Sequence, residues 1–99
     1  MRKFYLLRHE DINSNSGTGL VAQGVIFDQG GMCSMTWLTP FKTVTVFDSI
    51  MTVKKLHSHE GKTEVIIEGV KKDAKKYEYC LEQLALKKSI ARHEGESDE

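Results

Sequence analysis

The stretch LHSHEGKT, residues 56–63, places two histidines, a lysine and a threonine just before an apolar run. Imidazole, ammonium and hydroxyl groups at this spacing suit a metal site, an organic-ligand site or a polar turn. A zinc site needs at least a third protein ligand. The candidates for this third ligand are His9, Cys33, Glu60 and Cys80. None of them stands at a recognised metal-binding spacing from the two histidines. We therefore expect no metal, and we leave open whether the stretch is a polar turn or a site for an organic ligand.

Two stretches match the residue pattern of a phosphate-binding motif but lack the arrangement of strand and helix that such a motif needs. EGKT resembles the end of a P-loop, but Leu56 stands where the first glycine belongs. The stretch also follows an expected helix and precedes an expected strand, which is the reverse of the P-loop order. GTGLVA, residues 17–22, matches a dinucleotide fingerprint. A β-patterned segment follows it, however, and the chain is too short for a doubly wound sheet.

Nucleophilic catalysis has little support in the residue pattern. Cys33 alternates with Met35 and Trp37, as a core residue of a strand does, and Cys80 lies within an expected helix. A His57–Glu60 acid–base pair is no more specific than chance in a chain this charged. We therefore expect a protein that is not an enzyme. The polar run NSNSGTG, residues 13–19, offers hydroxyls and accessible backbone N–H groups that suit phosphate or ribose oxygens.

Five segments carry the β-branched, aromatic and alternating pattern of strands. They are residues 4–7, 20–27, 32–38, 42–48 and 62–68. The glycines of DQGG, residues 28–31, predict a tight hairpin, and Pro40 ends the third strand. The pattern predicts an α+β fold with a small antiparallel sheet of about five strands.

Two helices complete the expected fold. A short one follows the N-cap candidates Asp48 and Ser49, with a buried stripe of Ile50, Val53 and Leu56, and stops near His57. A long C-terminal one, residues 70–93, has one apolar face made of Val70, Ala74, Tyr77, Leu81 and Leu84. A second partial stripe consists of Tyr79, Leu86 and Ile90. This excess apolar surface favours a helix that also meets another subunit.

Length and charge limit the function. The chain has 99 residues, 39% of them hydrophobic, and 14 basic residues balance 14 acidic ones. We expect a single domain over residues 1–93 and a disordered acidic tail over residues 94–99. A net charge of zero argues against a binder of long nucleic acid but leaves room for a small anion. We expect no signal peptide and no membrane span, and two cysteines give no disulfide framework.

Four stretches, SGTGLVAQGVIF, MTWLTP, VFDSI and LHSHEGKTEV, together resemble a family of short phage and prophage proteins. Its pattern is S-G-T-G-x-V-A-x-G-V-x-F, a D-G hairpin, R-W-L, Y-x-S-I and I-H-G-H-x-G-x-T-x-V. The resemblance covers roughly residues 4–67. The chain departs from it at Gln23, Thr36 and Ser58. Thr36 in place of arginine puts a phosphate contact at that position in doubt.

This family is similar to phage anti-defence sponge proteins, which counter cyclic-oligonucleotide antiphage signalling (CBASS). The resemblance implies stoichiometric sequestration of a cyclic dinucleotide, such as cyclic GMP-AMP, without cleavage and without a cofactor. It also implies a homo-oligomer, for example a tetramer, in the cytoplasm of the infected bacterial host. The excess apolar surface of the C-terminal helix, which lies outside the resemblance, predicts that the subunits meet there. The ligand-binding residues would be Ser16, Gly17, Thr18, Gly19, Trp37, His57, His59, Lys62 and Thr63. A protein-binding inhibitor of a host enzyme and a small phosphodiesterase remain the alternatives.

Overall fold

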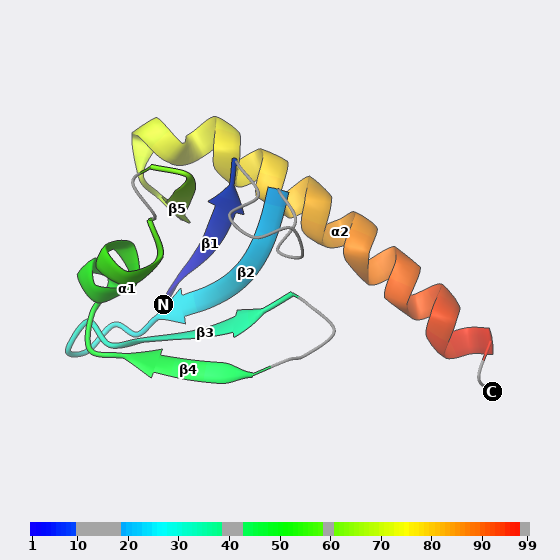
Figure 1. The fold of residues 1–99 in the computed structure, drawn as a ribbon, viewed down its shortest axis with the longest axis horizontal. Helices are drawn as coiled ribbons and strands as arrows, with labels where there is room; N and C mark the ends of the chain where they lie inside the picture. Colours follow the sequence, from blue (N-terminus) through cyan, green and yellow to red (C-terminus); the bar gives the residue numbers. More distant parts are fainter. Residues whose placement is uncertain (10–18, 39–42, 59–60, 98–99) are drawn as a thin grey trace.

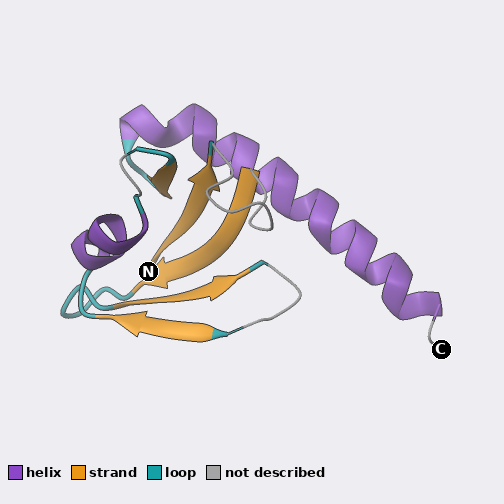
Figure 2. Cartoon of the chain, in the orientation of Figure 1, coloured by secondary structure: helices purple, strands orange, loops and turns teal. Residues whose placement is uncertain are grey.

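The protein, in a computed structural model, is a five-stranded antiparallel sheet with one helix on each face (Figures 1 and 2). Residues 1–9, 19–38, 43–58 and 61–97 are described, with side chains up to residue 86. The strand order is β4-β3-β2-β1-β5. The strands are β1 (Arg2–Arg8), β2 (Gly19–Ile26), β3 (Cys33–Trp37), β4 (Val44–Phe47) and β5 (Thr63–Ile67). The helices are α1 (Ile50–His57), the 3₁₀ turn η1 (Lys71–Asp73) and α2 (Ala74–Ser97). The predicted α+β fold is confirmed.

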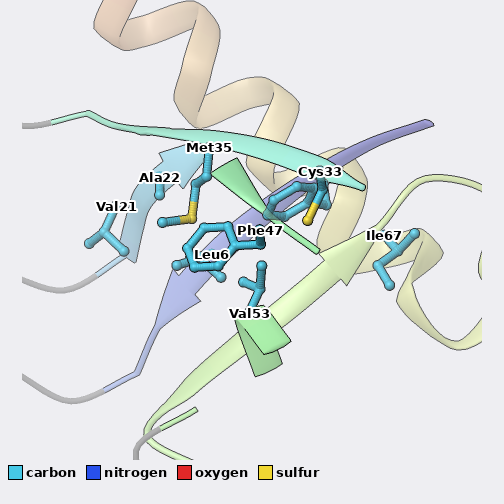
Figure 3. Close-up of a cluster of buried hydrophobic side chains, with 9 residues drawn as sticks. Leu6, Val21, Ala22, Cys33, Met35, Phe47, Val53 and Ile67 are labelled. Atoms are coloured by element: carbon cyan, nitrogen blue, oxygen red, sulfur yellow. The ribbon is translucent and has the colours of Figure 1, made fainter. Parts of the chain in front are cut away.

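The first core lies between the sheet and α1. Ser49 is the N-cap of α1, since its hydroxyl accepts a hydrogen bond from the N–H of Thr52 at 3.4 Å. Val53 is fully buried and reaches from α1 toward side chains of the sheet (Figure 3). The buried members of this core are Phe4, Leu6, Val21, Ala22, Cys33, Met35, Phe47, Val53 and Ile67.

The expected stripe of α1 is wrong in one residue. Ile50 packs against the core and Val53 lies within it, but the side chain of Leu56 is 57% exposed. Steps of three residues turn by only about 300°, so a third residue spaced by three drifts off the buried face. His57, four residues after Val53, takes that place instead.

The second core lies between the opposite face of the sheet and α2. Its buried residues are Tyr5, Leu7, Leu20, Ile66 and Cys80, and Tyr77 and Leu84 pack against them. The helix therefore packs positions 77, 80 and 84 against the sheet, and of these Cys80 is fully buried. The expected face is corrected at Leu81, which is 40% exposed, and at Ala74, which is exposed.

Helix α2 begins after η1 rather than at Val70 and continues to Ser97, past the expected end at residue 93. Figure 1 shows its C-terminal half running beyond the sheet. Tyr79 and Leu86, from the expected second stripe, are exposed, and Ile90 lies beyond residue 86, the last residue whose side chain is described. The division into a domain and an acidic tail stays a prediction. In the part of the chain described, no helix is both long and apolar enough to cross a membrane.

The turn between β2 and β3 follows the prediction from DQGG. Gly30 and Gly31 have φ angles of 75° and 68°, which glycine adopts without steric cost. The N–H of Phe27 donates to the carbonyl of Met32 at 2.8 Å and closes the hairpin. This turn lies at the end of the sheet opposite to the polar stretches singled out above.

Candidate ligand-binding site at the free edge of the sheet

One end of the sheet gathers the predicted ligand-binding stretches. Arg8, the last residue of β1, is paired with Gly19 on one side and with Thr63 on the other. The end of β3, at Trp37, and the end of α1, at His57, lie at the same end of the sheet, because β3 is antiparallel to β2 and His57 contacts Trp37. The predicted residues Ser16, Gly17, Thr18 and His59 lie outside the described residues.

His57 belongs to an aromatic cluster at the rim of the first core. The centre of its ring is 5.4 Å from that of Trp37 and 5.9 Å from that of Phe47, both in edge-to-face arrangements. His57 and Trp37 are half-buried, whereas Lys62 is exposed in the turn before β5. Contact of these three side chains with a ligand stays a prediction.

A hollow follows the outer edge of β5, next to this cluster of sheet ends, and we call it the trough. It has a volume of about 850 Å³ and lies between α1 on one side and η1 with the start of α2 on the other. The α1 side contributes Met51, Thr52, Lys54, Lys55 and Ser58. The opposite side contributes Val70, Lys72, Asp73 and Lys76. The strand between them contributes Thr63, Glu64, Val65 and Ile67.

The trough is electropositive. Four lysines face two carboxyl groups among its described lining residues, an excess of two positive charges if all are ionised. Lys76 Nζ lies 2.7 and 2.8 Å from the two carboxylate oxygens of Glu64. Lys54, Lys55 and Lys72 form no ion pair with any residue that the structure describes. Three ammonium groups around the trough are therefore available to an anion.

Glu64 is the carboxylate that pairs with Lys76 in the trough. Burial acts to raise its pKa, but hydrogen bonds from Lys76 and His9 outweigh it and leave the pKa below its ordinary value. His9 Nε2 is 2.9 Å from Glu64 Oε1. Glu64 is consequently ionised at neutral pH, and it ties the start of α2 to the edge of the sheet.

Thr63 supplies an unsatisfied polar group at the same place. Its side chain is 2% exposed, and its hydroxyl has no hydrogen-bond partner among the described residues. Its N–H donates to the carbonyl of Ser58 at 3.0 Å, which joins the strand to the end of α1. A buried hydroxyl without a partner costs roughly 1–3 kcal/mol, so a ligand oxygen or water that bonded it would remove this penalty.

Comparison with known protein families shows to which family the chain belongs. The model of a family described as Acb5 phage protein matches residues 1–68. The chain belongs to the Acb5 phage protein family. Membership suggests a phage anti-CBASS role. Neither curated proteins nor solved structures give a significant match.

The Acb5 match includes only part of the trough. It runs from β1 through β5 and contains α1, with Lys54, Lys55 and Thr63. Lys72 and Lys76 follow the matched region. One wall of the trough is thus built by the family-defined segment and the other by the C-terminal segment of this chain.

Both thiols of this Acb5 protein are packing groups. Cys33 and Cys80 are fully buried, one in each core. Burial raises the pKa of the Cys33 thiol, and it raises the pKa of Cys80 to about 11. Neither is a thiolate at neutral pH. Among the described residues, no three His, Cys, Asp or Glu side chains are grouped so that they could hold a metal ion.

The motifs of the sequence do not predict the lysines of the trough as site residues, although a repeated tripeptide indicates where some of them lie. The tripeptide VKK occurs twice, at residues 53–55 and 70–72, on either side of β5. Each valine is at least partly buried: Val53 fully, and Val70 packed against the first core. Lys54 and Lys55, after the first valine, and Lys72, after the second, are thereby placed on the two walls of the trough, whereas Lys71 does not line it.

Proposed function

We propose that this Acb5 family member binds a cyclic dinucleotide of the cyclic GMP-AMP type in the trough and holds it without cleaving it. Removal of this second messenger would leave the host CBASS defence without its signal. The observation that carries the proposal is the trough itself, with three lysines unpaired among the described residues and the buried hydroxyl of Thr63.

The size and charge of the trough suit such a ligand. Small-molecule sites have volumes of roughly 300–1,000 Å³, and this one has about 850 Å³. A cyclic dinucleotide carries two phosphate groups, and hydrogen bonds between ammonium and phosphate are about twice as strong as neutral ones. A few lysines are enough for two phosphates, in agreement with a chain whose net charge is zero.

The predicted histidine turn extends this site. Thr63 is shared between that turn and the trough, and Gly19 lies across Arg8 from it. We propose that His57, His59 and Lys62 meet the ligand at this end, together with Trp37. The loop with Ser16, Gly17 and Thr18 would form the facing wall.

We also propose that the protein acts in the host cytoplasm as a homo-oligomer formed through α2. The outward surface of α2 supports this, because Tyr79, Leu81 and Leu86 are all at least 40% exposed. A sponge must bind more tightly than the host effector, and subunit contacts that preorganise the trough would lower the cost of binding.

A sponge-and-release assay tests the proposed function. Purified protein is mixed with cyclic di- and trinucleotides and ADP-ribose-type signals and then filtered, and the retained fraction is heat-denatured. We expect cyclic GMP-AMP or a close relative to leave the filtrate and to return intact after heating. Recovery of a cleaved product would make the protein a phosphodiesterase. If the whole panel stays free, the proposal is wrong and a host protein becomes the leading target.

A further inference from the structure

Strand β5 is an edge strand, so half of its backbone groups point away from the sheet, at the edge that the trough follows. Two hydrogen bonds to β1 show which half. The N–H of Glu68 donates to the carbonyl of Lys3 at 3.0 Å, and the N–H of His9 donates to the carbonyl of Lys62 at 2.7 Å. Bonding alternates along an antiparallel pair. The even-numbered residues of β5 are therefore bonded to β1, and the odd-numbered ones point outward.

Both ends of this outward row are already bonded within the chain. At one end the N–H of Thr63 donates to Ser58, as described above. At the other end the N–H of Ile67 donates to Oδ2 of Asp73 at 3.1 Å, and the carbonyl of Ile67 accepts from the N–H of Val70 at 3.3 Å. The edge is thus closed to a further strand at both ends.

The middle of the row remains open. The N–H and C=O of Val65, a residue that lines the trough, point outward from the sheet and have no hydrogen-bond partner among the described residues. One residue is too short a window for strand addition by a peptide, which needs several residues in register. A donor next to an acceptor is instead the complement of a nucleobase edge, where an N–H group lies beside a ring nitrogen or carbonyl.

The surroundings of Val65 also suit a planar base. Met51 projects from α1 into the trough with 66% of its surface exposed, and Val70 lines the opposite wall. Their apolar side chains offer contact surfaces for the two faces of a ring system. Lys54 and Lys72 lie on the same two walls. The trough therefore has apolar contacts, a backbone donor–acceptor pair and cations along one hollow.

We propose that the free backbone window of Val65 binds the edge of one nucleobase of the ligand, while Lys54, Lys55 and Lys72 hold the adjoining phosphate. This inference rests on the proposed function and assigns a part of the nucleotide to each part of the trough. It requires the base to contribute to affinity. Adenosine and guanosine monophosphate should therefore bind more tightly than ribose 5-phosphate, which has the phosphate without the base.

Amide hydrogen exchange at Val65 tests the assignment in the wild-type protein. In the free protein we expect the Val65 amide to exchange faster than that of Ile67, which Asp73 holds. Saturation with cyclic GMP-AMP should slow exchange at Val65 by at least about tenfold, whereas saturating ribose 5-phosphate should leave it unchanged. Unchanged exchange at Val65 in the nucleotide complex would overturn the inference and leave the proposed function standing. A wild-type protein that binds no nucleotide overturns both.

A pair of variants gives an independent measurement. Val65→Pro removes the N–H at an edge position where proline is tolerated, and Val65→Ala shortens the side chain but keeps the N–H. We expect Val65→Pro to bind cyclic GMP-AMP about tenfold more weakly than Val65→Ala, the ratio that one lost hydrogen bond gives. Equal affinities of two folded variants would contradict the inference. If Val65→Pro does not fold, hydrogen exchange in the wild-type protein decides.

Discussion

The two edges of the sheet are protected in different ways. At β5, α1 and α2 stand on either side, Ser58 and Asp73 bond the ends of the edge, and lysines surround it. At β4, Val44 and Val46 are 72% and 59% exposed, on the side of the sheet away from α1. Edge strands invite pairing with other chains, and short length or nearby charge limits this. The β4 edge has only four residues, whereas the β5 edge is closed at both ends by polar groups and is followed by the trough.

Charge reversal on the walls of the trough, at the β5 edge, should have the largest effect, a loss of affinity for cyclic GMP-AMP. The double variant Lys54→Glu, Lys72→Glu should weaken cyclic GMP-AMP binding by at least about 100-fold, because two attractive charges become repulsive. The matched control Lys71→Glu, Lys75→Glu changes the net charge equally at exposed positions outside the trough lining. Isothermal titration calorimetry measures both. Equal losses in the two variants would mean that only the overall field matters and that the trough is not the site.

Removal of the cap at the far end of β5 should have the next largest effect. Asp73→Ala leaves the N–H of Ile67 without an acceptor, and Ile67 is 5% exposed. We expect the free energy of unfolding to fall by roughly 1–3 kcal/mol in urea denaturation. Glu78→Ala, at an exposed position of α2, serves as the control and should change it by less than about 0.5 kcal/mol. A change at Asp73 as small as that of the control would show that the cap contributes nothing.

A charge placed on the other edge should have the smallest effect. Val46→Lys introduces an ammonium group at an exposed position, so the free energy of unfolding should stay within about 0.5 kcal/mol of the wild-type value. Cyclic GMP-AMP affinity should be unchanged, and light scattering should give the wild-type mass. A smaller mass would make the β4 edge a subunit interface, in contrast to the proposed assembly through α2.

Local pattern was sufficient for most of the fold. Alternation in β3 correctly predicted Cys33 and Met35 as core residues, and DQGG correctly predicted a hairpin. Ser49, predicted as one of two N-cap candidates, caps α1. These features depend on residues within a few positions of each other, where backbone sterics and side-chain period decide the structure.

The rest depends on which strands become neighbours, and local pattern does not contain that information. Gly24 lies in the middle of β2 because a Cβ there would come within 2.4 Å of the ring of Phe4, on the adjacent strand. The trough exists because β5 pairs with β1 and becomes an edge, so that Lys54 from α1 and Lys72 from η1 line its opposite walls. In α2, Cys80 packs in the core as expected, but Leu81, also expected on the buried face, is 40% exposed, because the sheet selects the helix face.

The place of β1 in the sheet has a consequence for synthesis on the ribosome. This first strand lies between β2 and β5, so its second partner is made last among the strands. At roughly 5–20 residues per second, about 3–12 s separate the end of β1 from the end of β5. During that interval the apolar side chains of Tyr5 and Leu7 also lack the cover of α2. The nascent chain therefore exposes the α2-facing side chains of β1 until α2 has been translated, and a chaperone bound during this interval would limit aggregation.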